Sequence, residues 1–160
     1  MSDIEKMTLA ARTAMQKAAR SAETRQHSSV EPEHLLYEIF SEPGHRLMDM
    51  LKEVGLTSRG LTDAFSQRLQ GLGKLQHKSD PLVPSSNLQS LFKFSEAYCR
   101  ELGDSFISVE HFVVCATKLG GELSAWLKTL GLQEKHLHQA FLKFRQGESI
   151  ESEDPEAQYQ

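Results

Sequence analysis

Apolar residues recur every three or four positions along most of the chain, a spacing that places them on one face of an α-helix. Between residues 3 and 24, for example, this apolar face consists of Met7, Ala11, Ala14, Met15, Ala18 and Ala22. No segment alternates apolar and polar residues with the period of two that is typical of half-buried strands. The pattern therefore predicts an all-α protein in which strands are not expected.

Proline, glycine and short polar residues divide this pattern into eight predicted helices. Proline is tolerated in the first helical turn, hydroxyl groups accept hydrogen bonds from the first N–H groups, and glycine adopts the left-handed backbone that ends many helices. Two glycines and two prolines between residues 71 and 84 predict a linker or a long surface loop. The helices are expected to begin at or near residue 3, Pro32, residue 45, Thr57 or Ser58, Ser85 or Ser86, Ser108, Leu123 and residue 133.

The two halves of the chain are related in sequence. Residues 51–65 align with residues 127–141 without a gap, and seven of the fifteen aligned positions are identical. Residues 30–35 align with residues 107–112 at an offset of 77 instead of 76. Each half is too small to bury its own core well, so the two are expected to pack together with approximate two-fold symmetry. The expected fold is one domain over 1–146, with a four-helix repeat at about 1–71, a loop at 72–84 and a second four-helix repeat at about 85–146.

Composition and charge narrow the possible functions. The 160 residues are 39% hydrophobic and 25% charged, which is typical of a soluble globular protein. Residues 147–160 contain five acidic residues and no basic ones, so without them the formal net charge changes from −4 to +1. A nearly neutral body does not attract phosphates, and nucleic acid is therefore not expected as a partner. Residues 147–160 are expected to form a solvated acidic linker, because they hold too little apolar surface to fold.

The chain also lacks the signals of membrane insertion and secretion. No stretch approaches the ~20 consecutive apolar residues that span a bilayer. The N-terminus is acidic and polar, unlike a secretory signal. Two cysteines, Cys99 and Cys115, are too few for a disulfide scaffold and are predicted to be reduced core residues. We therefore expect a cytoplasmic protein that does not bind membranes.

Three segments resemble the N-terminal domain of the Clp AAA+ chaperones, most closely that of the ClpB-type disaggregases. They are VEPEHLL at residues 30–36, GDSFISVEHFV at 103–113 and GESIESEDPEAQYQ at 147–160. The resemblance covers almost the whole chain and implies an N-domain that engages unfolded or aggregated polypeptide for threading through the pore of a homohexamer. It also implies that ATP is used in ATPase modules outside this sequence, and that the domain itself needs no cofactor.

The resemblance also implies which residues bind the client polypeptide. Thr8, Asp104 and Glu110 match positions that the family associates with client engagement. Phe92 matches a residue of a nearby apolar patch, and His111 stands where some members carry an apolar residue. The resemblance therefore implies substrate-binding roles for these five residues.

The same residues have structural interpretations that rest on the chain alone. Thr8 and Asp104 lie near expected helix ends, where short polar side chains mostly accept hydrogen bonds from backbone N–H groups. Glu110 falls in a first helical turn, where a carboxylate stabilises the helix by about 0.3–1 kcal/mol. Phe92 and Phe94 point about 200° apart on their helix, so one ring is expected to be exposed or covered by the preceding loop.

Two other function classes stay open at this stage. The same fold could serve as the adaptor-docking or substrate-docking N-domain of a protease-coupled Clp unfoldase. A free-standing helical enzyme is a further alternative, although the chain has no Gly-x-Ser-x-Gly elbow and no local catalytic cysteine signature. His136 and His138 are two positions apart, a spacing that separates their rings on a helix, so no metal site is expected. Catalytic residues are not expected either.

Overall fold

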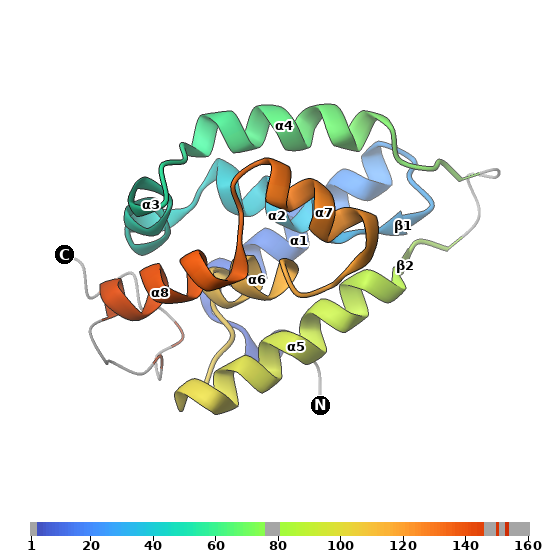
Figure 1. Cartoon of the computed structure of the whole chain (residues 1–160). Helices are drawn as coiled ribbons and strands as arrows, with labels where there is room; N and C mark the ends of the chain where they lie inside the picture. Colours follow the sequence, from blue (N-terminus) through green and yellow to red (C-terminus); the bar gives the residue numbers. More distant parts are fainter. Residues whose placement is uncertain (1–2, 76–80, 146–149, 151–152, 154–160) are drawn as a thin grey trace.

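The computed structural model describes residues 3–75, 81–145, 150 and 153 (Figure 1). A 3₁₀ turn, η1 (Asp3–Lys6), precedes eight α-helices in the described part of the chain, which confirms the predicted all-α class. The helices are α1 (Leu9–Thr24), α2 (Pro32–Ser41), α3 (Gly44–Glu53), α4 (Ser58–Gln70), α5 (Ser86–Leu102), α6 (Val109–Ala116), α7 (Gly121–Thr129) and α8 (Glu134–Arg145).

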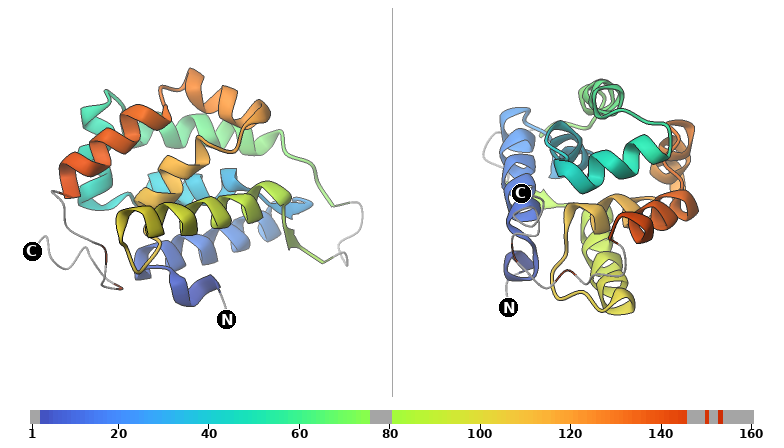
Figure 2. Two further views of the ribbon diagram at one scale, coloured as in Figure 1. Left: turned by 60° about the horizontal axis from the view of Figure 1, so that its bottom comes forward. Right: turned by 90° about the vertical axis from the view of Figure 1, so that its left-hand side faces the viewer.

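Helices α2 and α6 form the centre of the molecule. Every residue of α6 is buried, and α2 buries seven of its residues, including His34 and Phe40. Helix α2 packs against α1 and α4, while α6 packs against α5 and α8. The two central helices also contact each other, and α3 packs against α8. Figure 2 shows α1 and α5 on one side of this centre and α4 and α7 on the other. One continuous core therefore joins the two halves.

The described residues also contain two short strands, so the expectation of none was wrong. Strand β1 (Ser29–Val30) pairs in parallel with β2 (Val83–Pro84), which lies in the segment predicted to be a loop. Strands of two residues are too short to produce a period-two pattern, which is why the sequence gives no sign of them. A matching bridge joins Met7 to Ile107. Because the repeats are offset by 77 residues, this bridge is the two-fold counterpart of the β1–β2 pair.

Helix caps repeat with the same offset. The Thr8 side-chain oxygen accepts a hydrogen bond from the N–H of Ala11 at 3.2 Å, and the Ser85 oxygen accepts one from Leu88 at 3.1 Å. The first long helix therefore begins at Leu9 instead of residue 3, because Thr8 caps it. These caps fix the starting points of α1 and α5.

Removing the Phe112 side chain tests the shared core. Phe112 is fully buried on α6, and its ring meets that of Phe92 edge-on, with centroids 5.5 Å apart. We expect Phe112→Ala to lower the free energy of unfolding by about 3–5 kcal/mol, because it leaves a cavity between the halves. Urea denaturation measures this, with Leu142→Ala as the exposed control. Equal midpoints for the two variants would contradict the shared core.

Candidate functional site

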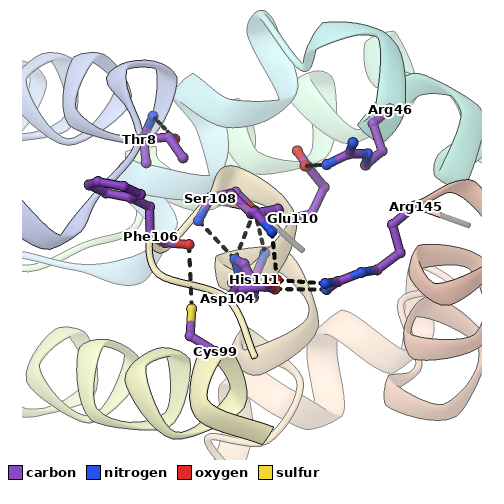
Figure 3. A network of polar contacts seen from close by, with 11 residues as sticks. Thr8, Arg46, Cys99, Asp104, Phe106, Ser108, Glu110, His111 and Arg145 are labelled. Carbon is purple, nitrogen blue, oxygen red and sulfur yellow. Dashed lines mark hydrogen bonds and ion pairs between the residues drawn. The ribbon is translucent and has the colours of Figure 1, made fainter. Parts of the chain in front are cut away.

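Asp104 is the centre of a buried polar network within the second repeat (Figure 3). Its Oδ2 atom accepts hydrogen bonds from His111 Nε2 and Arg145 Nη1, both at 2.7 Å. Its Oδ1 atom accepts one from Arg145 Nη2 and another, at 2.7 Å, from the backbone N–H of Ile150. Four donors thus surround one carboxylate. The network ties the loop after α5 to α6, α8 and the segment that follows α8.

The protonation states in this network follow from its hydrogen bonds. The backbone N–H of Ser108 donates to Nδ1 of His111 at 2.8 Å, so the ring proton lies on Nε2 and points at Asp104. Burial lowers the pKa of His111, and the ring is neutral. Burial alone would raise the pKa of Asp104, but the hydrogen bonds from His111, Arg145 and the Ile150 N–H outweigh it and hold that pKa at about 2. The carboxylate therefore stays ionised and neutralises Arg145.

The first repeat contains a counterpart of this arrangement. His34 is the repeat equivalent of His111, and its Nδ1 accepts a hydrogen bond from the backbone N–H of Glu31 at 2.9 Å. Its Nε2 lies 2.7 Å from Nδ1 of His27, which occupies the position equivalent to Asp104. A buried imidazole in one repeat thus takes the place of a carboxylate in the other.

The equivalent residues Glu33 and Glu110 both form ion pairs. Glu110 lies 3.6 Å from Arg46 of α3, and both side chains are buried. Glu33 lies 2.9 Å from Arg68 of α4, which also pairs with Glu122 of α7. Each pair or chain of pairs spans the two repeats. Glu110 therefore holds α3 against α6, in addition to occupying a first helical turn.

The five predicted site residues do not form one exposed cluster. Thr8, Glu110 and His111 are at most 2% exposed and Asp104 is 8% exposed, so all four are interior side chains. Asp104 accepts a hydrogen bond from a backbone N–H, as expected, but the donor is Ile150 and not a helix start, where Ser108 caps α6. Its pairing with Arg145, which lies 41 residues away, leaves no local trace.

The two neighbouring phenylalanines of α5 separate as predicted. Phe92 is partly buried against Phe112, and Phe94 is 40% exposed. Glu96, one helical turn beyond Phe92, pairs with Lys6 of η1 at 2.8 Å. Phe92 therefore lies on the face of α5 that is turned toward η1.

A groove between α1, α2 and the start of α6 was not anticipated from the sequence. It has a volume of about 270 Å³, and we call it the α1 groove; its lining consists of Leu9, Ala10, Thr13, Ala14, Lys17, Glu38, Glu42 and Val109. Leu9 is 50% exposed although it is a large apolar residue. Thr8 and Glu110 adjoin the lining residues Leu9 and Val109 in the chain, so these two buried residues position the groove walls.

The described chain also contains a second hollow and two cysteines. A larger hollow of about 690 Å³ lies away from the polar network, and its lining includes Thr117, Lys128 and His138. Both cysteines are free and buried, as predicted, and burial raises the pKa of Cys99 to about 12 and that of Cys115 to about 11. Within the described ranges, no three His, Cys, Asp or Glu side chains are grouped to hold a metal ion. Nor does any described helix have the length and apolar character needed to cross a membrane.

Comparison with known proteins identifies the architecture. A family described as "Clp repeat (R) N-terminal domain" matches residues 6–130. The chain belongs to this Clp N-domain family. The chaperone protein ClpB of Bacteroides thetaiotaomicron is 25% identical to this Clp N-domain over 153 residues, which are 96% of the chain. The aligned region is 18% of that ClpB, so the chain spans about a fifth of its relative's length.

Solved structures share the fold at lower sequence identity. The Hsp104 N-terminal domain from Candida albicans matches with a TM-score of 0.80 at 15% identity, covering 92% of this Clp N-domain and 97% of that chain. A ClpV N-domain in complex with VipB peptide matches with a TM-score of 0.69 at 19% identity, covering 91% and 90% of the two chains. These likenesses establish the fold.

Asp104→Asn tests the buried charge balance. The amide has nearly the shape of the carboxylate but removes the negative charge that Asp104 presents to the buried Arg145 guanidinium. We expect the free energy of unfolding to fall by about 3–5 kcal/mol, as measured by urea denaturation. Glu53→Gln removes the more exposed Glu53–Lys143 pair and serves as the control, with a much smaller expected loss. Equal losses in the two variants would show that the Asp104 charge is not needed.

The His27–His34 pair predicts a distinctive response to acid. Burial, His27 and Arg25 lower the pKa of His34 from 6.5 to about 4. The unfolded chain therefore takes up a proton at His34 near pH 6.5, whereas the folded chain does so only near pH 4. The contribution of His34 to the free energy of unfolding is therefore fully present above pH 6.5 and is lost as the pH falls toward 4. Over this range the free energy of unfolding changes by at most about 1.4 kcal/mol per pH unit.

Urea denaturation between pH 4 and pH 7.5 measures this slope. His34→Gln should make the stability less dependent on pH in this window, since the titrating group is gone. His136→Gln, which changes an exposed histidine, should leave the slope of the wild type. Identical slopes in all three proteins would contradict the assignment.

Proposed function

We propose that this Clp N-domain docks unfolded or aggregated polypeptide for a ClpB-like, ATP-dependent disaggregase. The α1 groove is the observation that carries the proposal, because it offers an exposed leucine beside the small side chains of α1, together with the charged lining residues Lys17, Glu38 and Glu42. The similarity to ClpB along 96% of the chain and the fold shared with a peptide-bound ClpV N-domain support it. The domain acts as a binding module, and ATP hydrolysis belongs to other parts of a homohexameric parent protein in the cytoplasm.

If clients dock in the α1 groove, the predicted site residues act by positioning its walls. Thr8 fixes the start of α1, Asp104 and His111 fix the loop beside it, and Glu110 fixes the end of α6 that carries Val109. These buried residues act as positioning residues for client binding. Phe92 supplies apolar surface on the neighbouring helix α5.

The groove suits weak and promiscuous capture. Its volume of about 270 Å³ accommodates a few side chains of a client. A client must also be released into the pore, so dissociation constants in the micromolar range or weaker are expected. A micromolar dissociation constant corresponds to a binding free energy of about −8 kcal/mol, and weaker binding to a less negative value. Nucleic acid and membranes are not proposed as partners, in keeping with the formal charge of +1 over residues 1–146.

Docking of one defined partner segment is the second candidate function. The ClpV N-domain was solved with a peptide of a named protein, VipB, and the α1 groove could hold a similar segment of an adaptor or substrate. In that case the parent would be a protease-coupled Clp unfoldase. Unrelated unfolded polypeptides would then bind poorly, whereas the disaggregase proposal predicts similar affinities for many of them.

Leu9→Asp is the direct test of the groove. The carboxylate makes the groove entrance polar, yet it favours the first turn of α1 and should leave the fold intact. We expect at least a tenfold loss of affinity for a reduced and alkylated polypeptide, measured by fluorescence anisotropy, and a smaller loss for Phe92→Ala. Leu142→Asp changes another exposed leucine, on α8, and should bind like the wild type.

Two results would overturn the proposed function. If the wild type does not associate with unfolded polypeptide even at high concentration, the chain is not a client-docking domain. If Leu9→Asp and Leu142→Asp bind equally well, the α1 groove is not the docking surface.

A further inference from the structure

Two residues beyond α8 are docked beside the α1 groove. The Ile150 carbonyl accepts hydrogen bonds from the N–H groups of Ser105 at 2.8 Å and Phe106 at 3.3 Å. The Ile150 N–H donates to Asp104, and the Glu153 carbonyl accepts from the N–H of Leu9 at 2.6 Å. We call Ile150 and Glu153 the docked pair. Together they place main-chain atoms of the C-terminal segment against the start of α1 and the loop after α5.

The contacts of the docked pair depend little on side-chain identity. Leu9, Ser105 and Phe106 donate through their backbone N–H groups, and the acceptors are backbone carbonyls. The Leu9 N–H belongs to the first turn of α1, where a helix has no internal partner for it. Recognition through the main chain is the way in which extended peptides of many sequences are bound at one site.

One side chain of the docked pair is firmly held. Ile150 is 3% exposed and belongs to the hydrophobic core. Glu153 forms an ion pair with Arg12 at 3.2 Å, but its side chain is 61% exposed, so this pair contributes little to affinity. The site therefore selects for one aliphatic side chain and accepts varied residues near it.

The α1 groove and this site are continuous. Leu9 lines the groove with its side chain, and its N–H binds the carbonyl of Glu153. An extended polypeptide that entered the groove could therefore reach the same N–H groups only after the docked pair had left. Because the docked pair is part of the same chain, its effective concentration is high and a client must compete with it.

We infer that the domain has a docking site for the main chain of an extended polypeptide, and that its own docked pair fills this site until a client displaces it. The site consists of the N–H groups of Leu9, Ser105 and Phe106, the Asp104 carboxylate and the pocket that holds Ile150. This inference rests on the proposed function and adds its regulation. An incoming aliphatic residue replaces Ile150, and the client carbonyls replace those of Ile150 and Glu153. No covalent bond changes in the exchange.

Ile150→Ser in the full chain tests this exchange. The polar side chain weakens the docked pair, so affinity for a reduced and alkylated polypeptide should rise three- to tenfold. Hydrogen exchange should reveal faster exchange at the amides of Ser105 and Phe106 in the variant, and renewed protection when the polypeptide binds. Leu142→Ser is the matched control and should change neither measurement. If the fold of Ile150→Ser is lost, Ile150→Ala is used, with a two- to fourfold expected gain.

A synthetic peptide of residues 148–154 provides an independent measurement. It should bind Ile150→Ser and reduce polypeptide binding by the variant, and it should bind the wild type at least threefold more weakly. Unchanged polypeptide affinity in a folded variant whose Ser105 and Phe106 amides exchange faster would overturn the inference and leave client docking intact. Absence of any polypeptide binding to the wild type would instead refute the proposed function, while peptide binding to the variant would still report the vacated site.

Discussion

The fold depends on one constraint: neither half of the chain can cover its own central helix. Helix α6 is buried along its whole length and α2 along most of it, which a bundle of four short helices cannot achieve alone. The halves therefore share a core, and each also lends a short backbone segment to the other through the β1–β2 pair and the Met7–Ile107 bridge. The candidate site lies beside the second of these exchanges, where α1 of one repeat meets α6 of the other.

Among the described residues, each buried Asp, Glu or Arg side chain lies beside an opposite charge. Asp104 faces Arg145, Glu110 faces Arg46, and the two central histidines are held neutral by backbone N–H groups and by burial. Removing one partner of such a pair costs more than the pair contributes, because a buried charge then remains uncompensated. These balanced pairs hold the helices and the loop around them together.

Local signals made much of the fold predictable. Thr57, Ser85 and Ser108 cap helices where the sequence places them, and the left-handed Gly103 ends α5. The helical spacing of apolar residues predicted the helices because most of them bury one face and expose the other. These features depend on neighbours within about four residues along the chain.

The candidate site was less predictable, because its contacts are distant in sequence. Asp104 and Arg145 are 41 residues apart, and the Glu110–Arg46 pair joins the two repeats. Two of the residues that the resemblance to Clp N-domains singled out, Thr8 and Glu110, adjoin residues of the α1 groove in the chain. The resemblance did not indicate that these side chains are interior. Burial of a polar residue requires knowledge of its partner, which no local pattern provides.

The two cysteines have a practical consequence for work on this domain. Both thiols are buried and resist ionisation, so alkylating dyes have almost no thiolate to attack while the domain is folded. A single cysteine introduced at an exposed position such as Met48 or Phe94 would therefore take up a fluorophore selectively, with no need to remove the native pair. The slow rate at which Cys99 and Cys115 are labelled would in turn report how often the core opens spontaneously.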